Sequence, residues 1–82
     1  MEKVTIDDLI EIIGEIIDIS KLQIDYRTVF GEDIPVDSKD MLRLISRIES
    51  RYRFRFEASE IIALKTVEDV LKIIQSHLKA ER

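Results

Sequence analysis

Apolar residues near the N-terminus recur every three or four positions, the spacing of one helix face, and acidic residues mostly fill the positions between them. The apolar positions are Ile6, Leu9, Ile10, Ile13, Ile16 and Ile17. Thr5 is a favourable N-cap, and Asp8 completes a capping-box pattern as a shorter relative of Glu. The pattern predicts a helix over residues 5–19.

A second helical period begins at or next to Ser38. When this segment is projected at about 100° per residue, its apolar residues fall within one arc of about 100°. That arc holds Met41, Leu44, Ile45, Ile48 and Tyr52, and the opposite arc holds Lys39, Asp40, Arg43, Arg47, Ser50 and Arg51. Arginines four residues apart destabilise an isolated helix by a few tenths of a kcal/mol per pair. Because the fold does not need this arrangement, we expect these arginines to serve binding.

The last third of the chain predicts a loop and two further helices. Residues 53–56 alternate Arg and Phe, but four residues without a partner make a poor strand. We expect a helix end and a loop whose Phe54 or Phe56 enters the core. A short helix is predicted over residues 58–64. Thr66 and Asp69 begin a last helix to about Lys79, whose apolar face is Val67, Val70, Leu71, Ile74 and Leu78.

Residues 20–37 show no clean period and predict a long loop. Pro35 restricts Ile34 to extended geometry and prevents a helix there. The expected apolar anchors of this loop are Tyr26, Val29 and Phe30. Loops of this length are uncommon and often functional. The whole pattern predicts an all-α fold, a small four-helix bundle with three main helices, one short helix and a long first loop.

Composition narrows the class of protein. A length of 82 residues predicts a single domain over residues 1–82. The lack of Cys excludes disulfides, thiolate metal sites and a Cys nucleophile. The N-terminus has no apolar signal core and no run approaches the roughly 20 apolar residues of a membrane span, so we expect a soluble cytoplasmic protein without stable membrane insertion. His77 is the sole His and no Ser/His/acid set is supported, so we do not expect an enzyme.

Charge is distributed unevenly along the chain. The net charge is −4 overall, but residues 1–37 carry −7 and residues 38–55 carry +4. A basic block within an acidic protein indicates a binding partner.

The stretch from Phe30 to Ser38 resembles acyl carrier proteins. It reads Phe-Gly-Glu-Asp-Ile-Pro-Val-Asp-Ser, similar to that family's Phe, acid-acid-hydrophobic and Asp-Ser elements. Further similar positions are Asp40, Leu44 and Ile48, the ungapped segment from Phe56 to Val67, and the start of the last helix at Thr66-Val67-Glu68-Asp69-Val70. The resemblance covers nearly the whole chain.

The resemblance implies a covalent carrier. A phosphopantetheinyl transferase would move 4′-phosphopantetheine from coenzyme A onto Ser38, and the thiol of this arm would hold an acyl group as a thioester for other enzymes. Asp37 and Lys39 flank the attachment residue, and Lys39 could pair with the phosphodiester. A helix N-terminus favours such an anion. The alternative is that Ser38 only caps the second helix, because Asp and Ser are both good caps.

A carrier of this kind shelters its acyl chain among apolar side chains. By resemblance and periodicity the candidate lining is Phe30, Met41, Leu44, Ile45, Ile48, Phe56, Ile61, Leu64 and Ile74. The alternative is that these residues are plain core. Ile61 stands where the family usually has a small residue, which could narrow the cavity.

Two features depart from the family pattern. Lys39 stands where Leu usually follows the modified Ser, and the second helix, usually acidic to match basic patches on partner enzymes, is basic here. The expected partner-binding residues are Lys39, Asp40, Arg43, Arg47 and Arg51. We expect a monomer that serves acyl-loading and acyl-transfer enzymes with acidic docking surfaces, in a specialised lipid, lipopolysaccharide or secondary-metabolite pathway.

Other interpretations remain open. The chain could be an aminoacyl carrier, or an unmodified interaction module of the same fold. The arginines interleaved with Tyr52, Phe54 and Phe56 would suit nucleic acid, but the protein is acidic and has no known binding motif, so we do not expect nucleic acid as a partner. Oxygen ligands for a weakly bound divalent cation are available at Glu32, Asp33, Asp37 and Asp40, but a solvated acidic loop is the favoured interpretation and we expect no metal site.

Overall fold

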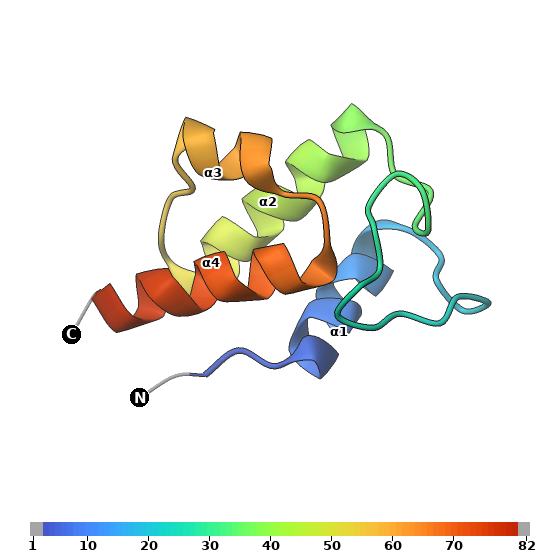
Figure 1. Ribbon diagram of the computed structural model, residues 1–82, viewed down its shortest axis with the longest axis horizontal. Helices are drawn as coiled ribbons and strands as arrows, with labels where there is room; N and C mark the ends of the chain where they lie inside the picture. Colours follow the sequence, from blue (N-terminus) through green and yellow to red (C-terminus); the bar gives the residue numbers. More distant parts are fainter. Residues whose placement is uncertain (1–2, 81–82) are drawn as a thin grey trace.

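The computed structural model describes residues 3–80, which form four helices. These are α1 (Ile6–Ile16), α2 (Ser38–Tyr52), α3 (Ala58–Ala63) and α4 (Val67–Ala80), as Figure 1 shows. Within this range the only strand-like pairing is two isolated bridges, Val29 with Thr66 and Phe30 with Ile34. The predicted all-α fold with three main helices, one short helix and a long first loop is confirmed.

The core is built by the three longer helices together with Val4, Ile34 and Phe56, which lie outside the helices. α1 packs against both α2 and α4, while α3 buries none of its residues and lies at the upper edge of Figure 1, away from α1. The largest fully buried side chains are Leu9, Ile12, Ile13, Ile34, Ile48, Val67, Val70 and Ile74. The apolar face of each long helix therefore meets a single core.

Helix α1 is shorter than predicted. It ends at Ile16, because Ile17 adopts an extended conformation and caps the helix with its N–H bound to the Ile13 carbonyl. Ile12, which the predicted stripe omits, is fully buried, whereas Ile10 is only half-buried. The run of isoleucines supports more than one apolar arc, and packing against α2 and α4 selects the one that includes Ile12.

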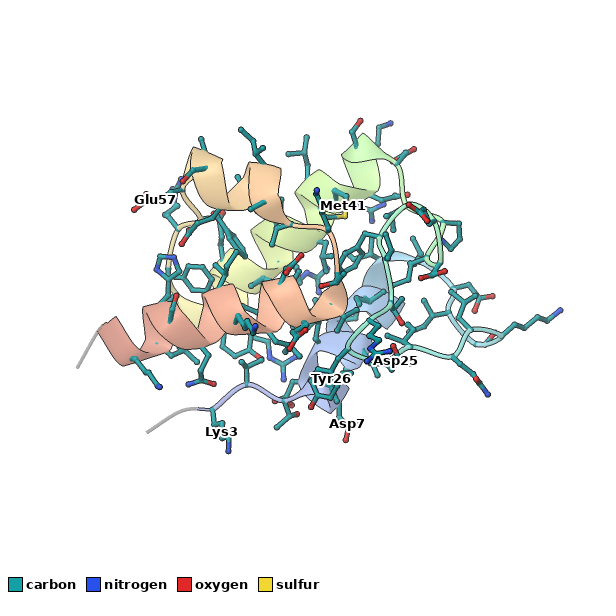
Figure 2. All side chains as sticks on the ribbon, in the orientation of Figure 1. Lys3, Asp7, Asp25, Tyr26, Met41 and Glu57 are labelled. Carbon is teal, nitrogen blue, oxygen red and sulfur yellow. The ribbon has the colours of Figure 1, made fainter. Side chains whose placement is uncertain are left out.

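The long loop is anchored only partly as predicted, because Phe30 packs against the core but Tyr26 does not. Tyr26, labelled in Figure 2, is 52% exposed, whereas Ile34 is completely buried. Tyr26 contributes its backbone instead, since its carbonyl accepts the Glu68 N–H at 3.0 Å, and the Phe30 N–H donates to the Lys65 carbonyl at 2.9 Å. The loop is therefore attached by its backbone to the segment that leads into α4.

A tight turn fixes the end of this loop. The Gly31 N–H donates to the Ile34 carbonyl at 2.8 Å. Gly31 has φ +91°, a backbone conformation that favours glycine. With the buried Ile34 side chain, this turn determines where the chain enters α2.

The segment after α2 is a loop, as predicted. Arg53 caps α2 in a left-handed conformation, with φ 61° and ψ 53°. Phe56 is buried, and its N–H donates to the half-buried Glu49 carboxylate at 2.9 Å. Phe54 is half-buried and packs edge-on against Phe56 at 5.0 Å between ring centroids. Both phenylalanines therefore join the core region.

One polar cluster joins the short α3 to α4. His77 Nε2 on α4 lies 2.9 and 3.1 Å from the two carboxylate oxygens of Glu60 on α3. The His77 ring also stacks on Phe54, with centroids 4.4 Å apart. Because α3 has no buried side chain, these contacts are a main link between it and the bundle.

Candidate functional site

The N-terminus of α2 is capped by Asp37. Its carboxylate accepts the Asp40 N–H at 2.8 Å, and the Asp40 carboxylate accepts the Asp37 N–H at 3.3 Å. The two residues form a reciprocal capping box. Ser38 is therefore the first residue of the helix and not its cap.

The Ser38 hydroxyl is available for chemistry. Ser38 is exposed, and its side chain makes no hydrogen bond with any other part of residues 3–80. Its N–H and that of Lys39 belong to the first turn, where backbone donors have no acceptor within the helix. Lys39 is exposed as well and forms no ion pair with the described residues. An anionic group attached to Ser38 therefore fits here, beside two backbone donors and one cation.

Most of the candidate acyl-lining residues lie in the core. Leu44, Ile45, Ile48, Phe56 and Ile74 are buried. Phe30, Met41 and Leu64 are half-buried and pack against the same cluster. Figure 2 labels Met41, which is on the first turn of α2.

Ile61 does not belong with this group. It is 36% exposed and lies outside the core cluster. It is on the six-residue α3 at the surface of the bundle, and its expected place in the acyl lining stays a prediction.

Two of the α2 arginines pair with α1. Arg47 Nη1 lies 2.6 Å from Glu15 Oε1, and Arg51 Nη1 lies 3.3 Å from Glu11 Oε1. These two arginines therefore also link α2 to α1, and their expected role in partner binding stays a prediction. Exposed pairs of this kind contribute about 0–1 kcal/mol each. The sequence signal was an acidic pair at i, i+4 on α1 matching a basic pair at i, i+4 on α2.

The other charged side chains of α2 differ in whether they have a partner within the described chain. Arg43 and Lys39 are exposed and have no ion-pair partner in the described part of the chain. Both acidic residues of the helix already accept backbone N–H groups, Asp40 from Asp37 and Glu49 from Phe56. Because α2 has four basic residues and only two acidic ones, its net charge is positive.

Comparisons with known proteins identify the family. Residues 7–74 match the family model described as the phosphopantetheine attachment site. An acyl carrier protein of Chlamydia trachomatis serovar L2 is 34% identical over 71 residues, covering 87% of this chain and 92% of the relative. An acyl carrier protein of Brachyspira hyodysenteriae is 31% identical over 75 residues, which cover 90% of this chain and 96% of the relative. One of Wolinella succinogenes is 25% identical over 71 residues, covering 87% and 93%.

This chain belongs to the acyl carrier protein family. The resemblance inferred from the sequence is confirmed, and the group that it carries is 4′-phosphopantetheine. Members of this family are carriers and not catalysts.

The structure also bears on the nucleic-acid interpretation. Tyr52 and Phe56 are buried, and Phe54 is stacked on His77. The three rings that alternate with arginine in the sequence are therefore not available to stack on bases.

The acidic residues near Ser38 are occupied by backbone contacts. Asp33 accepts the Val29 N–H at 2.9 Å, and Asp37 and Asp40 cap α2. Residues 3–80 contain no group of three or more side chains placed to hold a metal ion.

In the same range, no helix is long and apolar enough to cross a membrane.

Proposed function

We propose that Ser38 is the residue that receives 4′-phosphopantetheine, and that the arm carries acyl groups as thioesters to partner enzymes. The observation that carries this proposal is the exposed Ser38 hydroxyl on the first turn of α2, which Asp37 rather than Ser38 caps. The hydroxyl can be modified without the loss of a helix-capping hydrogen bond.

The neighbours of Ser38 have separate roles in this proposal. Asp37 fixes the start of the helix through its bond to the Asp40 N–H. Lys39 supplies a positive charge beside the phosphodiester, and the free first-turn N–H groups supply donors. Without an anion nearby, Lys39 would oppose the helix dipole by some tenths of a kcal/mol.

An acyl chain would enter the bundle from the Ser38 end. The half-buried Phe30 and Met41 lie close to Ser38 in sequence and pack against the core. We assign them to the entrance, with Leu64 beside them. The buried candidates Leu44, Ile45, Ile48, Phe56 and Ile74 would form the deeper lining.

The basic α2 defines the partners that we propose. Besides a phosphopantetheinyl transferase, these are acyl-loading and acyl-transfer enzymes whose docking surfaces are acidic. The support is the unpaired positive charge of Lys39 and Arg43 next to the attachment residue. A specialised lipid, lipopolysaccharide or secondary-metabolite pathway, with the carrier as a cytoplasmic monomer, belongs to the same proposal.

Loading in vitro tests the attachment residue. The full chain is incubated with coenzyme A and a promiscuous phosphopantetheinyl transferase, and its intact mass is measured. We expect a gain of one phosphopantetheine, no gain for Ser38→Ala, and a full gain for the control Ser46→Ala, which removes another exposed hydroxyl on α2. No gain by the unchanged chain, or a gain by Ser38→Ala, would refute the proposal, and the former favours an unmodified interaction module.

A further inference from the structure

The segment that follows α2 presents two arginines to solvent. Burial alternates along it, since Arg53 and Arg55 are exposed, Phe54 is half-buried and Phe56 is buried. The two phenylalanine rings pack edge-on against each other and against the core. The guanidinium group of neither arginine makes a hydrogen bond or an ion pair within residues 3–80. Both groups are therefore available to a ligand.

Arg53 has a backbone conformation that favours glycine. Its φ of 61° and ψ of 53° are left-handed, and among the described residues it is the only non-glycine residue with a positive φ. A helix that ends in this way most often has Gly at that position, because the Cβ of other residues disfavours it. A cation near a helix C-terminus stabilises the helix dipole, but Arg51 already supplies one in the last turn. The strained backbone therefore indicates a role for the Arg53 side chain itself.

Both arginines line the same shallow hollow in the surface. The hollow has a volume of about 570 Å³, and its lining residues are Ser46, Glu49, Ser50, Arg53, Phe54 and Arg55. Glu49 is the single carboxylate among them, and it already accepts the Phe56 N–H at 2.9 Å. The lining therefore offers two guanidinium groups and two serine hydroxyls as donors against one carboxylate.

We propose that this hollow binds the phosphate group of a small ligand. Near pH 7 a phosphate monoester carries almost two negative charges and has three strong acceptor oxygens. These oxygens do not lie in one plane, so the phosphate can accept from both guanidinium groups and a hydroxyl at once. A carboxylate has two oxygens, which a single guanidinium can occupy in a bidentate pair. The donors of the hollow therefore fit a phosphate better than a carboxylate.

The phosphate site goes beyond the proposed carrier function. α2 has 15 residues from Ser38 to Tyr52, which place its two ends about 21 Å apart. The phosphodiester of an arm on Ser38 is therefore fixed at the opposite end of the helix and does not occupy the hollow. A ligand bound beside Arg53 and Arg55 leaves Ser38 and Lys39 free.

Single-stranded nucleic acid fits the hollow less well than a small phosphate ligand. Bases stack on open aromatic faces in sites of that kind. Phe54 is the one aromatic residue of the lining, and its ring is stacked on His77 with centroids 4.4 Å apart. The hollow therefore favours a ligand that is recognised through its phosphate.

A titration with inorganic phosphate tests the site. The full chain is titrated at constant pH and constant ionic strength, with phosphate replacing chloride, while backbone amide shifts are recorded. We expect saturable shifts at Ser46, Ser50 and residues 53–55, with a Kd of about 1 mM, the strength of a few charge-assisted hydrogen bonds. Absence of a saturable shift, or shifts spread evenly along α2, would overturn the proposal.

Substitutions in the lining should change the affinity in opposite directions. Arg53→Gly and Arg55→Ala should each weaken phosphate binding about tenfold, because each removes one charge-assisted contact. Gly suits the left-handed backbone at position 53, so this variant keeps the end of α2. Glu49→Gln should tighten binding about threefold, since it removes the opposing charge while its amide oxygen can still accept the Phe56 N–H. Unchanged affinity for Arg55→Ala would contradict the site.

Arg43→Ala is the matched control. It removes the charge of another exposed arginine that has no ion-pair partner in the described part of the chain. Arg43 lies ten residues before Arg53, which corresponds to about 15 Å along α2 and exceeds the Debye length of about 8 Å at physiological ionic strength. Its affinity should stay within about twofold of that of the unchanged chain. Equal losses for Arg43→Ala and Arg55→Ala would show a diffuse charge effect and overturn the proposal.

Vesicles distinguish a dissolved phosphate ligand from a lipid headgroup. Binding to phosphatidylcholine vesicles that requires added phosphatidic acid, and that Arg55→Ala abolishes, assigns the phosphate to a lipid. Binding of inorganic phosphate without binding to these vesicles assigns it to a dissolved ligand. Both results support the site, and failure of both probes to bind overturns it.

Ser38→Ala separates the phosphate site from the carrier function. This variant cannot take the arm at that residue, and we expect it to bind inorganic phosphate with unchanged affinity. Loss of phosphate binding in Ser38→Ala would place the bound anion at the start of α2 and overturn the proposal. The phosphate site and the attachment at Ser38 can therefore fail independently.

Discussion

At the scale of single residues, Asp37 caps α2 and Ser38 offers a free hydroxyl, two roles that the sequence alone could not assign. Both are good helix caps, and either could have started α2. In the structure Asp37 accepts the Asp40 N–H, and Ser38 keeps an exposed hydroxyl outside the capping bonds. The position thus combines a fixed backbone with a free hydroxyl that can act as a nucleophile, which suits a site modified by another enzyme.

Because only Asp37 caps the helix, substitutions at Asp37 and Ser38 should lower the free energy of unfolding by different amounts. Asp37→Ala should lower the free energy of unfolding by about 1 kcal/mol, because the first turn loses its cap. Ser38→Ala should change it by less than about 0.5 kcal/mol, since the hydroxyl makes no bond within the described chain. Urea denaturation of the apo forms measures both values. A Ser38→Ala cost equal to that of Asp37→Ala would contradict the assignment of the cap.

At the scale of elements, the sequence predicts what is local and misses what depends on packing. The capping box of Thr5 with Asp8 and the buried stripe of α2 each follow from spacing along one helix, and both are present. The burial of Ile34 and the pairing of Arg47 with Glu15 depend on how separate segments meet. For that reason the sequence suggested binding roles for arginines that partly hold α1 against α2.

The link between α3 and α4 predicts a response to acid. The Glu57 N–H and the His77 ring lower the pKa of Glu60 below its ordinary value. The Thr66 N–H likewise lowers the pKa of Asp69, whose carboxylate accepts it at the start of α4. A lowered carboxyl pKa adds stability above the unfolded-state pKa, about 4.3 for Glu and 3.9 for Asp. That stability is lost as the pH falls through the folded-state pKa.

We therefore expect the free energy of unfolding to decrease as the pH falls below about 4, and Glu60→Gln to make this decrease shallower. Urea denaturation at a series of pH values measures the slope. The matched control is Glu32→Gln, which removes an exposed loop carboxylate that has no hydrogen bond within residues 3–80. Equal slopes for Glu60→Gln and the unchanged chain would show that the contact between Glu60 and His77 does not contribute to the loss of stability in acid.

At the scale of the whole molecule, an acidic protein presents a basic helix beside its attachment residue. Residues 1–37 carry a net charge of −7, and two of their carboxylates neutralise Arg47 and Arg51. The unpaired cations are left at the two ends of α2 and in the loop that follows it. The chain belongs to the acyl carrier family and shares its cofactor. The partners with acidic docking surfaces that we propose follow from this charge.

The central claim is that Ser38 carries the arm and its cargo. The protein is isolated from its native cell, digested, and the peptide that contains Ser38 is fragmented in a mass spectrometer. We expect 4′-phosphopantetheine on Ser38, with an acyl group on the thiol in part of the population. A Ser38 peptide found only in its unmodified form, or an arm found on another residue, would contradict the account.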